Sequence, residues 1–300
     1  MHARCFPRRG SGLPDQGRGI GLGLSLGLGL GLAGHLLAAD PDPVSAALAA
    51  WRQGERTNAL QLIARAVEAS PQDLRAWVTR AQFLARSGQR AAALTNYDQA
   101  IRLEPRAAML RYQRGNERYR AGRLEDALAD FDEANRLDPR LAPQNWQRGI
   151  ALYQVGRFAD GRKQFEIHQT VNPRDVENAA WHFLCTAREQ GLEAARRQLI
   201  PIEGDGRIPM KEVQAVLAGK GSVDAVRQAA AAGDPAERRQ HAFYGHLYLA
   251  LYFEALGDAL AAGKELRAAV ELADEADYMG DVARVHLQRT PPARPGPAPQ

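Results

Sequence analysis

Two side chains of the kinds that bind metals or act as nucleophiles, His182 and Cys185, stand three positions apart in an apolar run. On a helix this spacing puts both on one face, where His168 could join them from an earlier segment. Two or three ligands without a carboxylate cluster fall short of a closed zinc site. Packing in a helix interior explains the pair better, and a metal- or thiol-dependent activity at His182 and Cys185 is kept as an alternative.

The remaining signals for chemistry are weaker. His241 and His246 are five residues apart and point in different directions on a helix. Asp205, in the stretch EGDGR, lacks the ligand set of a calcium loop and indicates a turn. From residue 40 on, the sequence has no phosphate-binding loop, no Gly-x-Ser-x-Gly elbow and no His-Glu-x-x-His helix. We therefore predict a protein that is not an enzyme, with no catalytic residues, no cofactor and no metal.

The elements that carry these residues repeat along the chain with a period of 34. Prolines and glycines both keep this step; they are Pro71, Pro105, Pro139 and Pro173, and Gly54, Gly88, Gly122 and Gly156. With each proline counted as position 32, the repeats run 40–73, 74–107, 108–141 and 142–175. Small residues recur at positions 8, 20 and 27 and a bulky one at position 24, most clearly in GRLEDALADFDEANRLDP at 122–139.

This pattern resembles the tetratricopeptide repeat (TPR), a helix–turn–helix unit that stacks into a solenoid. Small residues suit the places where two helix backbones come closest. The glycine at position 15 suits a left-handed residue that ends the first helix, and the proline stops the second. We predict an all-α fold, a TPR α-solenoid of helix–turn–helix repeats in a right-handed superhelix, with an irregular helical C-terminal part.

The repeats divide the chain. Four TPR repeats are expected over 40–175, the first of them degenerate, as suits a terminal cap. After an irregular helical segment at 176–236 the spacing returns in a C-terminal TPR-like repeat at 237–289. The Pro-rich end, 290–300, reads as a disordered tail.

Residues 1–39 have the layout of a signal peptide, with an Arg-containing flank before a Leu- and Gly-rich stretch. Cleavage after Ala39 would export the chain to the periplasm or cell envelope. Two alternatives are kept: an uncleaved membrane anchor through residues 20–39, and a translation start placed too early. The leader also holds three of the four formal positive charges, so the remainder is nearly neutral and nucleic-acid binding is not expected.

In a TPR stack the first helix of each repeat lines a concave face. The resemblance implies that positions 2, 5, 9, 12 and 13 point into this groove. Aromatic and Arg side chains there are of the type enriched in binding hot spots, and we expect a protein or peptide partner to contact them. The predicted groove residues are Arg86, Tyr112, Asn116, Tyr119, Arg120, Trp146, Tyr153 and Gln154. The alternative is that Tyr112, Trp146 and Tyr153 only pack against the neighbouring repeat.

The stretch 241–256 carries five aromatic residues. It is expected either to cover residues 201–236 or to serve as a surface for self-association into a homodimer or larger assembly. The irregular middle followed by FYGHLYLALYFEALGD also resembles NlpI-type bacterial envelope proteins, TPR scaffolds that tether partner proteins. This resemblance implies a non-enzymatic scaffold or adaptor of the cell envelope. No cysteine stands at the expected cleavage point after Ala39, so a lipid-modified N-terminus is not expected.

Overall fold

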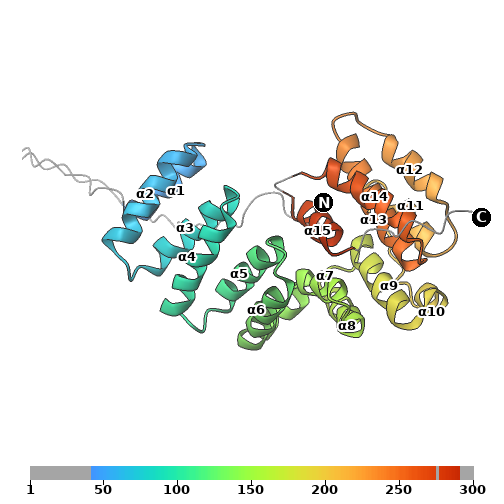
Figure 1. Cartoon of the computed structure of the whole chain (residues 1–300), viewed down its shortest axis with the longest axis horizontal. Helices are drawn as coiled ribbons and strands as arrows, with labels where there is room; N and C mark the ends of the chain where they lie inside the picture. The colour runs from blue at the N-terminus through green and yellow to red at the C-terminus, as the bar shows by residue number, and fades with distance from the viewer. Residues whose placement is uncertain (1–41, 275–276, 291–300) are drawn as a thin grey trace, which may run out of the picture.

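The structure is a computed structural model that describes residues 42–274 and 277–290. These residues form fifteen α-helices and one 3₁₀ helix, and no strand occurs among them (Figure 1). The predicted leader at 1–39 lies outside the described residues, as does the predicted tail beyond residue 290. Within the described part, no helix combines the length and the apolar character needed to cross a membrane.

Four helix pairs follow one another along an arc and correspond to the four expected repeats (Figure 1). The pairs are α1 (Pro43–Arg52) with α2 (Arg56–Ala69), α3 (Leu74–Arg86) with α4 (Arg90–Leu103), α5 (Ala108–Arg120) with α6 (Leu124–Leu137), and α7 (Trp146–Gln154) with α8 (Phe158–His168). The four glycines at position 15 join the two helices of each pair with φ between 74° and 84°. The predicted all-α TPR solenoid is confirmed.

Small residues at position 8 lie where the two helices of a repeat touch. A methyl group added at Gly115 would come within 2.8 Å of Phe131, and one at Gly149 within 2.6 Å of Phe165. Both phenylalanines occupy position 24 and are almost wholly buried. Glycine is needed at position 8 of these repeats because the aromatic ring at position 24 occupies the space that a side chain would fill.

Arginine at position 7 links consecutive repeats. Arg114 donates to Asp98 of the preceding repeat and to Asp130 of its own, at 2.7 and 2.6 Å. Arg148 makes the same pair of bonds one repeat later, to Asp132 and Gln164. Each arginine thus connects its own repeat to the one before it.

The fourth repeat begins later than its spacing predicts. The 3₁₀ helix η1 (Pro139–Gln144) precedes α7, and Asn145 then caps that helix by accepting from the Arg148 backbone N–H. Pro143 cannot donate a backbone hydrogen bond inside an α-helix, which delays the α-helix to Trp146.

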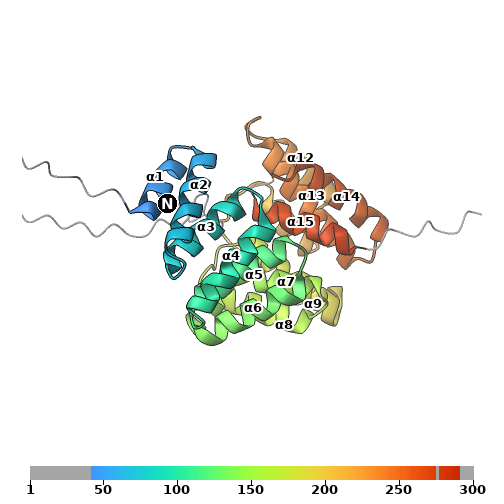
Figure 2. The same ribbon diagram turned by 60° about the vertical axis from the view of Figure 1, so that its left-hand side comes forward.

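Beyond the repeats the chain turns back over the arc (Figures 1 and 2). The helices of this part are α9 (Val176–Gln190), α10 (Leu192–Arg197), α11 (Met210–Leu217), α12 (Val223–Ala231), α13 (Arg238–Ala255), α14 (Ala259–Leu272) and α15 (Tyr278–Arg289). The α13–α14 pair lies where the late repeat is expected, and its two helices are again joined by a positive-φ glycine, Gly257. Phe243, Tyr244 and Tyr248 of α13 are buried, so this helix acts mainly as a core element.

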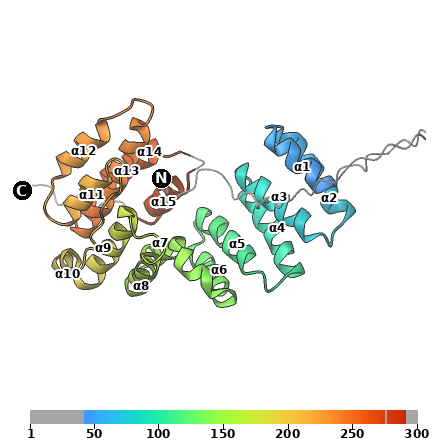
Figure 3. The ribbon, with the colours of Figure 1, turned by 180° about the vertical axis from the view of Figure 1, so that it is seen from behind.

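The final helix, α15, lies inside the arc, against α5 and α7 on one side and α14 on the other (Figures 1 and 3). It belongs to a large core that begins at Tyr119 and runs through α9 and α13 to Val285. A separate core of α1, α2 and α3 is centred on Ile63 and on Trp51, whose ring stacks on Phe83 at 4.1 Å. The N-terminal repeats are therefore a less integrated part of the molecule.

Candidate functional site: the concave face

The concave face is built from the first helices of the repeats. Arg86 lies on α3, while Tyr112, Asn116, Tyr119 and Arg120 lie on α5. Trp146, Tyr153 and Gln154 lie on α7. The structure thus distributes the eight predicted groove residues over three neighbouring helices, and it adds an element that the repeat pattern does not reveal.

That element is α15, which begins with an aromatic anchor. The Tyr278 ring stacks on Tyr119 with centroids 5.3 Å apart and meets Trp146 edge-on at 5.1 Å. The Arg120 guanidinium lies over the same ring, 5.1 Å from its centroid. Three predicted groove residues therefore hold a residue of the chain itself, by aromatic and cation–π contacts.

Hydrogen bonds and an ion pair reinforce this contact. Asp281 of α15 receives hydrogen bonds from Arg90 at 3.1 and 3.2 Å, and the Arg120 Nε lies 3.4 Å from its Oδ2. Gln154 accepts from the Tyr119 hydroxyl at 2.8 Å and donates to the Val282 carbonyl at 3.4 Å. Side chains thus bind both the carboxylate and the backbone of α15.

Tyr153 joins a second polar group deeper in the face. Its hydroxyl donates to Glu254 of α13 at 3.0 Å, and His286 Nε2 of α15 lies 2.6 Å from the other oxygen of that carboxylate. Burial acts to raise the pKa of Glu254, but the hydrogen bonds from His286 and Tyr153 and the charge of Arg188 hold it below its ordinary value. The carboxylate therefore stays ionised and links α7, α13 and α15.

These contacts decide which groove residues an outside partner can reach. Tyr119 and Tyr153 are buried, at 0% and 2% exposure, so a partner cannot touch them while α15 is in place. Tyr112 and Trp146 are half-buried, whereas Arg86 is exposed. The accessible part of the face thus lies toward the N-terminal repeats, and a partner-binding role for any of these residues stays a prediction.

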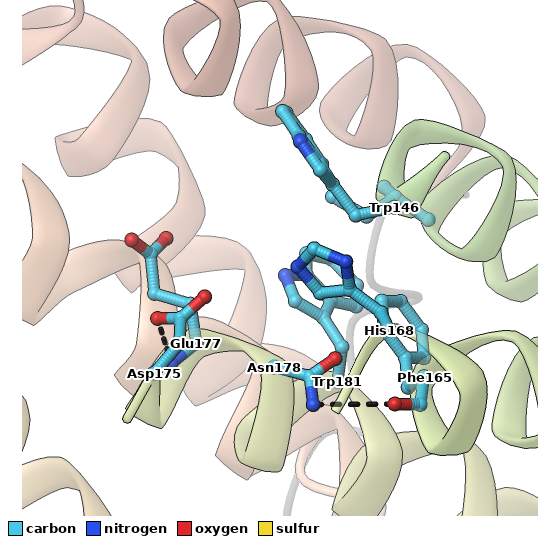
Figure 4. A pocket seen from close by; sticks show the side chains of 8 residues that line it. Trp146, Phe165, His168, Asp175, Glu177, Asn178 and Trp181 are labelled. Atoms are coloured by element: carbon cyan, nitrogen blue, oxygen red, sulfur yellow. Dashed lines mark hydrogen bonds between the residues drawn. The ribbon is translucent and has the colours of Figure 1, made fainter. Parts of the chain in front are cut away.

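A small pocket lies at the seam between α7, α8 and α9 (Figure 4). It is lined by Trp146, Ile150, Phe165, His168, Asp175, Glu177, Asn178 and Trp181. Figure 4 shows the two carboxylates on one side of this pocket, away from the aromatic rings. Two buried carboxylates so close together require a cation to pair with them.

The chain itself supplies that cation from a loop. Arg207 bonds Asp175, Glu177 and Asp205 together, and the Tyr248 hydroxyl donates to Glu177 at 2.7 Å. Burial raises the pKa of Glu177 to about 8, against the opposing effect of the Arg207 charge. Asp205 also accepts from the Arg207 backbone N–H, so it forms the expected turn. The pocket is accordingly part of a structural ion network.

The His182–Cys185 pair lies in the buried middle of α9. His182 Nε2 is 3.5 Å from Glu166, and His168 is directed instead to the Pro143 carbonyl at 2.7 Å. Burial raises the pKa of the Cys185 thiol, opposite to the shift that makes a cysteine nucleophilic. Within residues 42–274 and 277–290, no group of three His, Cys, Asp or Glu side chains is arranged to hold a metal ion.

The fold and its concave face define a helical-repeat solenoid whose groove is partly filled by its own last helix. Residues 79–142 match the family model of the tetratricopeptide repeat, so this part of the chain contains TPR repeats. No curated protein sequence matches the chain.

Three solved structures are similar to the chain to different degrees. A tetratricopeptide repeat protein from Parabacteroides merdae aligns with a TM-score of 0.52 at 13% identity, over 83% of this chain and 97% of its own. MamA from Desulfovibrio magneticus gives 0.48 at 17% identity, over 52% and 88%. PilF from Pseudomonas aeruginosa gives 0.46 at 17%, over 77% and 90%. Only the first of these supports the fold, and the narrower resemblance to NlpI-type proteins stays a prediction.

Proposed function

We propose that this protein is a non-enzymatic scaffold that binds a protein or peptide partner on the concave face of its N-terminal repeats. The observation that carries the proposal is the docking of α15. The C-terminal half of this face holds a helix of the same chain by aromatic, arginine and amide contacts. Among the residues that the structure describes, none covers the half formed by α1 and α3 in this way, and Arg86 is exposed there. A surface that binds one segment and continues beyond it is suited to bind another.

We further propose that the scaffold works in the cell envelope. The support is the Arg-containing flank and the Leu- and Gly-rich stretch within residues 1–39. An N-terminal mass measurement on protein recovered from the envelope fraction tests this. A chain starting at Asp40 supports export and cleavage, an intact leader in the membrane fraction supports an anchor, and recovery only from the cytosol rejects the location.

Partner capture from the same fraction tests the binding role. The bait is the full chain, compared with a variant that carries Gln82→Ala, Arg86→Ala and Met109→Ala on α3 and α5. The matched control carries Gln61→Ala and Arg65→Ala on the exposed side of α2. A partner held by the wild type and the control but lost by the groove variant supports the proposal. A partner held equally by all three rejects the concave face as its site.

Self-association is a second candidate function, favoured by two exposed apolar side chains near the α13–α14 turn. Leu256 and Leu260 are 43% and 72% exposed. Light scattering at micromolar concentration, with Leu260→Asp as the comparison, tests it. A dimer that the substitution dissolves supports self-association, and a monomer in both samples rejects it.

A further inference from the structure

The Asp281 carboxylate is held by three arginines: Arg284 of its own helix, at 3.0 Å, and Arg90 and Arg120, whose places in the repeat are defined. Arg90 is the first residue of α4 and Arg120 is the last residue of α5. Together they hold a side chain that is only 3% exposed. An arginine from the second helix of one repeat and an arginine from the first helix of the next thus form one carboxylate site.

The same pair of arginines occurs exactly one repeat earlier in the sequence. Arg56 is the first residue of α2, and Arg86 is the last residue of α3. Each stands 34 residues before its counterpart at the Asp281 site. The connecting glycines Gly54 and Gly88 both have positive φ, like Gly122. Because equivalent positions of stacked repeats have equivalent surroundings, Arg56 and Arg86 frame a second site of the same design.

The earlier site has more uncompensated positive charge than the occupied one. Beside Arg120 lies Glu117, 4.0 Å away, and the equivalent position one repeat earlier is Phe83. In the part of the chain that the structure describes, neither Arg56 nor Arg86 forms an ion pair, and both are exposed. The acidic neighbour in sequence, Glu55, accepts from Asn58.

Trp51 orients one of the two guanidinium groups in advance. The Arg56 guanidinium lies over the Trp51 ring at 4.0 Å and donates to the Trp51 carbonyl at 3.5 Å. Trp51 is itself fixed by its stacking on Phe83. A planar guanidinium held on a ring is limited in its rotamers, which lowers the entropy cost of binding a carboxylate.

We propose that Arg56 and Arg86 form a carboxylate-binding site for an acidic segment of a partner protein. The segment lies along the concave face in line with α15 and places an Asp or Glu side chain between the two arginines, as Asp281 lies between Arg90 and Arg120. The charge of the site selects this chemistry, since arginine pairs bind carboxylates through charge-assisted hydrogen bonds. This inference rests on the proposed scaffold function and specifies the partner's chemistry.

The test is the binding of a fluorescein-labelled hexaglutamate peptide to the full chain, followed by fluorescence anisotropy at low ionic strength. Arg56→Glu and Arg86→Glu are each expected to weaken binding roughly tenfold or more, because each reverses a charge at the site. Arg65→Glu is the matched control, since Arg65 is exposed on α2 and forms no ion pair in the described residues. It should leave the affinity within about twofold. Circular dichroism verifies that all three variants are folded.

If all three variants weaken hexaglutamate binding equally, the peptide is attracted by overall charge only, and the proposal is overturned. It is also overturned if the Arg56 and Arg86 variants bind hexaglutamate as tightly as the wild type. A dimer of the chain that Arg86→Glu dissolves would assign the site to a second copy and also overturn it. If hexaglutamate binding fails while the α3–α5 groove variant still loses its captured partner, the carboxylate site is rejected and the scaffold function stands. If hexaglutamate binds as expected but no partner depends on the groove, the scaffold function is rejected instead.

Discussion

At Gly149 the two helices of the fourth repeat approach so closely that a methyl group would lie 2.6 Å from the Phe165 ring. We expect Gly149→Ala to lower the free energy of unfolding by about 1–3 kcal/mol, because the overpacking outweighs a gain of about 1 kcal/mol in helix propensity. Urea unfolding followed by circular dichroism measures it. Gly206→Ala is the control, since a methyl group there has no heavy atom within 4 Å. A Gly149→Ala protein as stable as the wild type would contradict the predicted close contact.

Glu177 makes stability depend on pH. Its pKa is raised from 4.5 to about 8 in the folded protein by burial, so the folded state holds the proton over a range where the unfolded chain has lost it. The free energy of unfolding must then fall as the pH rises from about 5 to about 8, with a slope of at most about 1.4 kcal/mol per pH unit from this group. We expect Glu177→Gln, which cannot ionise, to remove this slope.

Urea unfolding of both proteins near pH 5 and near pH 8 tests the Glu177 prediction. The variant should gain stability relative to the wild type as the pH rises. Titratable groups elsewhere in the molecule are present in both proteins, so their contributions cancel in the comparison. A difference between the two proteins that does not change with pH would mean that Arg207 keeps Glu177 ionised throughout.

At the scale of the element, the docking of the helix α15 depends on Tyr278, its first residue. Tyr278 packs on Tyr119 and Trp146, while its buried hydroxyl has no hydrogen-bond partner. We expect Tyr278→Ala to cost about 3 kcal/mol of unfolding free energy, because it removes the ring and leaves a cavity. Tyr278→Phe keeps the ring and removes an unsatisfied hydroxyl, so it should be neutral or stabilising by about 1 kcal/mol. Thermal unfolding separates these outcomes, and equal losses in both variants would show that the hydroxyl, not the ring, holds the helix.

The docking of α15 could not be predicted from the sequence, whereas the repeats could. The helix pairs, their glycine turns and the packing at position 8 could be predicted, because they follow from residues less than 34 positions apart. The contact between Arg90 and Asp281 joins residues 191 positions apart, and no spacing rule connects them. The predicted concave residues Tyr119, Arg120 and Trp146 were chosen for their exposed position, and they bind a segment of the same chain. Tyr278 and Asp281 were missed because a single helix after the last repeat has no periodic counterpart.

For the whole molecule, the division of the core predicts unequal local stability. The core of α1, α2 and α3 is separate from the large core that unites α5 to α9 with α13 and α15. In a repeat protein each repeat is stabilised mainly by its neighbours, and the first repeat has only one. We therefore expect amides of α1 and α2 to exchange at least about tenfold faster than those of α9 and α13 under native conditions.

Hydrogen exchange with mass spectrometry measures this difference in exchange rate. The Tyr278→Ala variant then shows which helices depend on the docking of α15. Loss of the Tyr278 ring should speed exchange in α5, α7 and α15, which it joins, and leave α1 and α2 unchanged. Tyr278→Phe should change neither region. Uniform protection from α1 to α15 would contradict the divided core, because it would mean that the arc unfolds as one cooperative unit. If Tyr278→Ala speeds exchange only in α5, α7 and α15, the rigidity of this half of the groove depends on the docking of α15. The lower stability of the N-terminal half is then independent of that docking.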